Sequence, residues 1–499
     1  MLDQLSILTS RWRYNPWVYG ILGVALALVA GVLIARFGMM GGLLVIGLPV
    51  GVAALVGVLI EPRIGLYLYA TFSFMIGMAR FLDGDLQVGL GLDGILVLTF
   101  AGTLLNANRM DWSRLKNPAF YLVILWLIYT ILEYFNPDSP YPPAWFYHAR
   151  SFSLSWFFLS FTVLVNPISR QNVWLLIKTW IVWSLLAAAW GFKQQYGHVI
   201  GLRDLEQAEL NWLAAGGART HILWGQLRSF SFYSDAGQFG AEMAGVTLVC
   251  IILLMAEKSW FYRFLYLGLS LVMFWGFAVS GTRSALFVLV GGFGAFIVLQ
   301  RKLKPILYSA AAGIPLLLIL FFTHLGDGVY QIYRIRTALR PSEDASFLVR
   351  LENQQRLKAY LADLPFGTGI GSSSGAGTRF TPWHWAAQIP PDSWYVQLWI
   401  ETGIVGLSLY LFVLAGIILT GIWRLWNIKD PWTTTLMLVL LAEFIGICVV
   451  SYSNPIIWQY PTSAMIYINS MLFASANRWD KKEESKPKVH GSKLASAYS

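Results

Sequence analysis

The chain has 499 residues, of which 57% are hydrophobic and only 12% are charged. A soluble domain carries about 25% charged residues, so this composition excludes an ordinary soluble protein. Many apolar runs reach the length of about 20 residues that crosses a bilayer as a helix, which predicts an all-α polytopic membrane protein. The formal net charge of +10 fits basic cytoplasmic loops better than nucleic-acid binding, so we expect a lipid bilayer as partner and no nucleic acid.

The apolar runs predict about 12–14 transmembrane helices, the lower number applying if the two shortest runs do not span. The predicted spans cover residues 16–35, 41–60, 64–79, 88–105, 118–135, 151–166, 172–190, 237–256, 264–280, 284–299, 305–323, 403–424, 434–452 and 458–475. Cys250 and Cys448 both fall inside spans. We expect them to be small apolar fillers, with no disulfide and no metal site.

Basic residues in the short loops predict the orientation. Alternate loops carry lysine or arginine, and these are 61–63, 106–117, 167–171, 257–263, 300–304 and 425–433, together with the C-terminal tail. The positive-inside rule places them, and both chain ends, in the cytoplasm. The long outer loops are then 136–150, 191–236 and 325–402, which are rich in aromatic residues and proline.

The predicted organisation has four parts. A transmembrane bundle (1–324) precedes a large periplasmic loop (325–402), C-terminal transmembrane helices (403–477) and a disordered cytoplasmic tail (478–499). Within the large loop, leucines among charges at 344–363 predict an amphipathic helix that Pro365 ends. The following glycine-rich stretch, 367–377, lacks the strand and helix of a dinucleotide site, and we interpret it as a tight loop beside a functional site.

Two arginines at the predicted outer interface are candidates for binding an anion. Arg283 lies in the turn S-G-T-R-S-A, residues 280–285, and Arg228 precedes small polar residues and a helix N-terminus. A guanidinium suits phosphate, and a helix N-terminus attracts negative charge. The alternatives are a snorkelling arginine and, for Asp235, a simple helix cap.

Two residues near the end of the large loop are candidates for a general base. Asp392 begins the re-entry into the membrane, and His384 lies among tryptophans eight residues earlier. Each has a structural alternative, namely a helix N-cap for Asp392 and a packing role for His384. Further substrate-binding candidates are Arg219, Arg350, Ser393 and Gly369, and a solvated surface charge is the alternative for Arg219.

The order of these motifs resembles the O-antigen ligase and O-antigen polymerase superfamily. The pair Asp392-Ser393 is followed by nine residues and then Gly403-x-x-Gly406, and P-F-G-T-G-I-G occupies 365–371 of the late loop. The S-G-T-R-S-A turn and the Arg228 segment also match, so the resemblance covers roughly 170–475. Ligases of the family usually have histidine at the first position of the pair. Aspartate there favours a polymerase or another glycan-transfer branch.

The resemblance implies a metal-independent and cofactor-free glycosyltransferase at the outer face of the bacterial inner membrane. The donor would be a glycan on undecaprenyl pyrophosphate, and the acceptor a hydroxyl of a glycan or lipid-linked sugar. Arg228 and Arg283 would hold the pyrophosphate, and Asp392 or His384 would take the acceptor proton. A secondary transporter or flippase for lipid-linked glycans is the alternative, but its internal repeats and midplane broken helices are not found in the sequence.

Overall fold

The computed structural model describes residues 16–81, 88–197, 222–223, 226–301 and 345–480, together with positions 307, 315, 318, 322, 323 and 336. Apart from one two-stranded antiparallel ribbon, the elements of this part of the chain are helices. The ribbon pairs β1 (Ile222–Leu223) with β2 (Gln226–Leu227). The predicted all-α class is confirmed.

The helices follow the predicted apolar runs closely. In chain order they are α2 (Pro16–Ile60), α3 (Arg63–Met75), α4 (Val88–Leu105), α5 (Pro118–Leu132), α6 (Trp145–Ala149), α7 (Ser155–Val165), α8 (Arg170–Tyr196), α10 (Ala236–Ala256), α11 (Trp260–Val279), α12 (Leu286–Leu299), α15 (Ala345–Tyr360), α16 (Ser374–Phe380), α17 (Trp385–Gln388), α18 (Trp394–Asn427), α19 (Pro431–Val450) and α20 (Thr462–Ala474). Helix α15 is the amphipathic helix expected over 344–363.

Six helices of the described residues are long and apolar enough to cross a membrane, and the chain is a multi-pass membrane protein. These six do not reach the predicted 12–14 for two reasons. Several predicted spans form apolar helices of fewer than 18 residues, such as α12 and α20. The predicted span 305–323 lies almost wholly outside the described residues.

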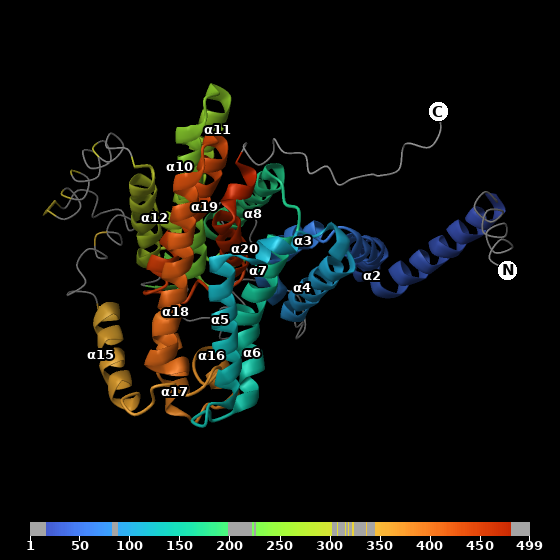
Figure 1. The fold of residues 1–499 in the computed structure, drawn as a ribbon. Helices are drawn as coiled ribbons and strands as arrows, with labels where there is room; N and C mark the ends of the chain where they lie inside the picture. The colour runs from blue at the N-terminus through green and yellow to red at the C-terminus, as the bar shows by residue number, and fades with distance from the viewer. Residues whose placement is uncertain are drawn as a thin grey trace, which may run out of the picture.

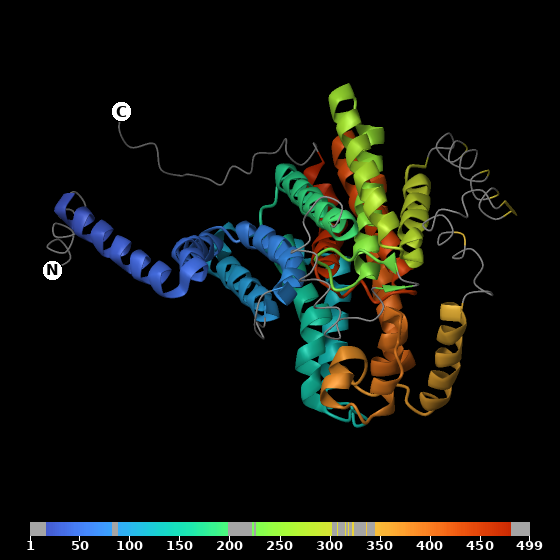
Figure 2. The same ribbon diagram turned by 180° about the vertical axis from the view of Figure 1, so that it is seen from behind.

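The bundle is centred on α10 and α19. In the most apolar 18-residue stretch of each of these helices, 78% of the residues are buried. Both views show α10, α11 and α19 running side by side, whereas α2 extends away from the bundle (Figures 1 and 2). The two predicted N-terminal spans, 16–35 and 41–60, form this one helix with a kink at Gly38, where φ is 54°. The expected loop between them is therefore a bend within a helix.

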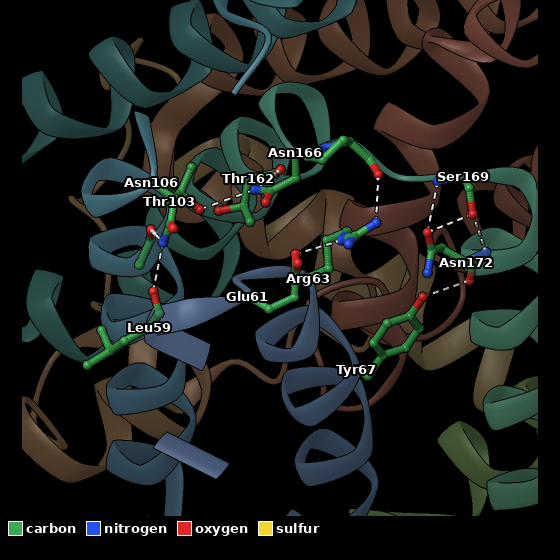
Figure 3. A network of polar contacts seen from close by, with 12 residues as sticks. Leu59, Glu61, Arg63, Tyr67, Thr103, Asn106, Thr162, Asn166, Ser169 and Asn172 are labelled. Carbon is green, nitrogen blue, oxygen red and sulfur yellow. Dashed lines mark hydrogen bonds and ion pairs between the residues drawn. The ribbon is translucent and has the colours of Figure 1, made fainter. Parts of the chain in front are cut away.

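The loops predicted to be cytoplasmic gather at one end of the bundle. Arg63 donates to the Pro167 carbonyl (3.0 Å), and Asn106 donates to the Leu59 carbonyl (2.7 Å), within the network of Figure 3. Arg170 forms an ion pair with Asp430 (2.9 Å) at the same end. Loops far apart in sequence thus share one side, as the predicted topology requires. Which side faces the cytoplasm stays a prediction.

Helices begin within two of the predicted outer loops. In the loop 136–150, α6 begins at Trp145 and continues through a π-helical turn, residues 150–154, into α7. In the large loop 325–402, α18 begins at Trp394. Residues 394–402 are therefore the first turns of a membrane helix that bends at Gly403, where φ is 62°.

Candidate functional site

Arg228 and the S-G-T-R turn lie together, as the anion-site prediction requires. Helix α11 ends at Val279, and Gly281 (φ 58°) turns the chain before the 3₁₀ turn that starts at Arg283. Arg228 Nε donates to the Ser280 carbonyl (3.1 Å), and Arg228 Nη2 donates to Thr282 Oγ1 (2.8 Å). Arg228 is thus fixed on the turn that carries Arg283.

This turn lies against the N-terminus of α10. Thr282 Oγ1 donates to the Ala236 carbonyl (2.8 Å), in the first turn of that helix. The structural alternative for Asp235 holds, because its carboxylate caps α10 by accepting the Gln238 amide (2.9 Å). Two arginines therefore lie where α10 and α12 both begin, and helix N-termini carry partial positive charge.

Residues 451–461 connect this corner to the start of α18. Gln238 Nε2 donates to the Tyr460 carbonyl (2.7 Å), and the Trp394 amide donates to the Ser451 carbonyl (3.0 Å). Segments at 228, 282, 394 and 451–461 are therefore linked by hydrogen bonds at the end of the bundle opposite Arg63 and Asp430.

Asp392 lies at this end, but it does not cap α18. The N-cap is Ser393, whose Oγ accepts the Val396 amide (3.4 Å), so the predicted capping alternative for Asp392 is wrong. The Asp392 side chain is 46% exposed and lies 3.8 Å from Arg350 Nε. Its φ of 46° is unusual for a residue with a side chain and directs the chain sharply into the helix. An accessible carboxylate beside a guanidinium can accept a proton or bind a hydroxyl.

His384 has a defined structural role. Its Nδ1 accepts the Ala386 amide (3.3 Å), so His384 caps the short helix α17, and its ring lies 5.4 Å from that of Trp385. Burial lowers the pKa of His384. Among the described residues, no hydrogen bond or ion pair joins His384 to Asp392. Arg219 lies outside the described residues.

The P-F-G-T-G-I-G loop completes the bend of α18. Gly403 interrupts the backbone hydrogen bonds of α18. The backbone groups that lose their helical partners there bond to the loop instead. The Ile400 carbonyl accepts the Thr368 amide (2.9 Å), and the Pro365 carbonyl accepts the Val405 amide (3.2 Å). Gly369 has φ 81°, and a Cβ there would lie 2.6 Å from Ser139 Cβ. Gly369 is thus required by backbone conformation and close packing.

A buried polar network at the same bend was missed by sequence reasoning. His148 Nδ1 and Glu401 Oε2 are 2.8 Å apart, and their side chains are only 4% and 0% exposed. Ser373 Oγ donates to Glu401 Oε1 (2.6 Å), and Gln397 Nε2 lies 3.3 Å from His148 Nε2. The available signals were a histidine just before a predicted span and a glutamate inside the re-entry motif. Spacing alone could not pair residues 253 positions apart.

A second polar pair lies two residues further along the chain from His148. Arg150 Nη1 forms an ion pair with Asp93 Oδ2 (2.7 Å). Aromatic rings and an arginine gather near Arg150. Arg379 lies 5.0 Å from the Tyr147 ring centre, and Phe380 stacks on Tyr141 (5.7 Å between ring centres). The aromatic outer segments therefore converge into one cluster of Tyr141, Tyr147, Arg379 and Phe380, which we call the aromatic cluster.

Together these features define a multi-pass helical membrane protein with its candidate site residues at one end of the bundle. Among the described residues, no group of three or more histidine, cysteine or acidic side chains is placed to hold a metal ion. Residues 268–411 match a family model described as O-antigen ligase. The resemblance is confirmed over this stretch, which holds the S-G-T-R turn, the P-F-G-T-G-I-G loop and Asp392 but not Arg228. No curated protein matches the chain, and no solved structure does.

Proposed function

We propose that this protein transfers a glycan from a polyprenyl-pyrophosphate donor to a sugar hydroxyl at the membrane surface. The observation that supports the proposal is that segments of the O-antigen ligase match are linked by hydrogen bonds, directly or through residues 451–461 and the start of α10. The loop 365–371 fills the bend of α18, and α18 begins beside residues 451–461, which contact α10 near Arg228 and Arg283.

Arg228 and Arg283 are proposed to hold the donor pyrophosphate. Both lie where α10 and α12 begin, so the guanidinium charges and the helix N-termini act together on an anion. The polyprenyl tail would remain in the bilayer along the apolar faces of the bundle. As the bond to the sugar breaks, negative charge grows on the pyrophosphate, and these groups stabilise it without moving.

Asp392 is the proposed base. It is accessible, it lies outside the helical ladder, and it is free of the capping role that Ser393 fills. The acceptor oxygen attacks the anomeric carbon while its proton passes to Asp392. The bond from that carbon to the phosphate oxygen breaks, and polyprenyl pyrophosphate leaves with both electrons. A single displacement inverts the anomeric centre.

The aromatic cluster is proposed to stack sugar rings near this site. Tyr141 and Tyr147 are 43% and 45% exposed, so part of each ring faces solvent. Aromatic faces pack against the C–H faces of sugars, and Arg379 adds hydrogen-bond donors. His384 stays the second candidate for the base, and Arg350 would orient Asp392.

The end of the bundle carrying these residues is proposed to face the periplasm of a bacterial inner membrane, with both chain ends in the cytoplasm. Thr378 and Lys258 are exposed on the two ends, and Cys250 and Cys448 are buried. In a background without native cysteines, Thr378→Cys should react with an impermeant maleimide in cells with a permeabilised outer membrane. Lys258→Cys should react only after lysis. The opposite pattern would invert the proposed topology.

Deletion of the protein followed by analysis of surface glycan distinguishes the two acceptor classes. Short, unpolymerised glycan in the deletion strain supports a polymerase, whereas long glycan left unattached supports a ligase. Complementation with the wild type should restore the pattern, and Arg283→Ala should not. Unchanged glycan length and attachment in the deletion strain would contradict a role in glycan transfer.

A further inference from the structure

The buried pair of His148 and Glu401 is not needed by the chemistry proposed above, and its energetics call for an explanation. Removing a carboxylate and an imidazole from water is costly, and apolar residues of similar size would stabilise the fold at least as well. Instead, Glu401 is satisfied on every side, by His148, by Ser373 Oγ (2.6 Å) and by the backbone of Gly371. A buried carboxylate that is hydrogen-bonded from several sides has a fixed position.

The network fixes one face of the first turns of α18. Trp394, Gln397 and Glu401 are three and four residues apart, so they lie along the same side of that helix. All three contact His148: the Trp394 ring centre is 6.0 Å away, Gln397 Nε2 is 3.3 Å from Nε2, and Glu401 Oε2 is 2.8 Å from Nδ1. These turns begin directly after Asp392.

His148 is itself held rigidly. Its ring is packed against Phe152 and Trp458, each 5.0 Å away between centres, and its carbonyl accepts the Ser151 hydroxyl (2.9 Å). The π-helical turn 150–154 follows at once, and such turns are frequent at functional sites. Helix α6 therefore provides a fixed reference against which α18 is placed.

We propose that His148 and Glu401 are positioning residues for the transfer reaction. Their buried contact joins α6, the loop before α16 and the first turns of α18, and so places Asp392 relative to the arginine corner. Trp394 transmits this placement, because its amide bonds to Ser451 on the segment that contacts α10. The proposal rests on the proposed glycan transfer.

The test uses His148→Gln and Glu401→Gln in the full-length protein, with Glu242→Gln as the matched control. Glu242 is also a buried carboxylate, bonded to Trp180 and Thr462, but it lies outside the site. We expect kcat to fall about 100-fold in the first two variants, with KM for the donor little changed, since a small misplacement has an effect of this size. Glu242→Gln should keep kcat. Equal kcat in wild type and His148→Gln would overturn the proposal.

A double-mutant cycle separates positioning from general damage. In an Asp392→Glu background, where the carboxylate is already displaced, His148→Gln should lower kcat by a much smaller factor than it does in the wild type. If His148→Gln lowers kcat by the same factor in both backgrounds, His148 does not act through Asp392. If His148→Gln fails to fold, Ser373→Ala takes its place. This variant removes a single hydroxyl, and we expect it to lower kcat by a smaller factor.

A distance measurement tests whether His148 and Glu401 position α18 without the need for an activity assay. Spin labels at Phe146→Cys on α6 and at Asp392→Cys, in a cysteine-free background, should give a narrow distance distribution that broadens with Glu401→Gln but not with Glu242→Gln. An unchanged distribution would refute positioning. If the wild type transfers no glycan, the proposed function fails, and this measurement still decides whether the pair holds α18 in place.

Discussion

Replacing Gly403 with alanine should destabilise the protein and impair its activity. Gly403 has φ 62° and ψ −169°, a backbone region that is essentially restricted to glycine and that costs an alanine on the order of 1–3 kcal/mol. A Cβ there would also collide with the Pro365 carbonyl, so the P-F-G-T-G-I-G loop would have to move away from α18.

Lost contacts of the P-F-G-T-G-I-G loop account for the rest of the expected loss in the free energy of unfolding. Moving the loop breaks the bonds from the Val405 amide to Pro365 and from the Thr368 amide to Ile400, each contributing about 1 kcal/mol. The sum is a loss of about 3–5 kcal/mol in the free energy of unfolding. Glu401, two residues before the bend, would shift with it.

The assay is thermal unfolding of the purified protein in one detergent, with Gly268→Ala as the control. Gly268 lies within α11, and a Cβ there meets no atom within 4 Å, so alanine should leave the stability unchanged or raise it by up to about 1 kcal/mol. A Gly403→Ala protein that unfolds at the temperature of the wild type would refute the account of the bend.

Further predictions concern the residues proposed to carry the chemistry. Arg283→Ala and Arg228→Ala should each reduce transfer by the equivalent of about 2–4 kcal/mol, measured with purified donor at equal protein levels, and lysine should rescue only in part because it lacks the planar fork. Asp392→Asn should abolish transfer without changing stability. Ser393→Ala should lower the free energy of unfolding by about 1 kcal/mol, because the N-cap of α18 is lost. The reverse pattern would make Ser393 the catalytic residue and Asp392 the cap. The pKa of His384 is lowered by burial, so the unfolded chain protonates first as the pH falls below about 6.5 and stability is lost in that window. His384→Asn, which keeps a capping acceptor, should unfold with a weaker pH dependence there, and an identical dependence would contradict this.

The spans and the sorting of loops could be predicted because both follow from local composition. Apolar runs predicted α10, α11 and α19 within a few residues, and basic loops predicted that the segments around Arg63 and Asp430 share one end. Breaks within apolar runs were harder to predict. Gly38 and Gly403 bend their helices without ending them, and a glycine in a sequence does not say whether the chain turns back or continues.

The site could be predicted only in part, because its contacts join distant segments. Arg228 and the S-G-T-R turn were expected at one interface, and they meet there. The His148–Glu401 contact could not be expected, since nothing local distinguishes a paired buried histidine from one on an exposed loop. The capping assignment failed by a single position, because Ser393 and Asp392 are both good caps and only the positive φ of Asp392 decides between them.

Reconstitution with a defined donor tests the central claim most directly. Purified protein in liposomes would receive a polyprenyl-pyrophosphate oligosaccharide labelled in both the sugar and the lipid, with a sugar acceptor outside. The account predicts one new inverted glycosidic bond for every polyprenyl pyrophosphate released, with no added metal, with strongly reduced product from Arg283→Ala and with no product from Asp392→Asn. Movement of intact donor across the bilayer without release of polyprenyl pyrophosphate would contradict glycan transfer and identify a transporter.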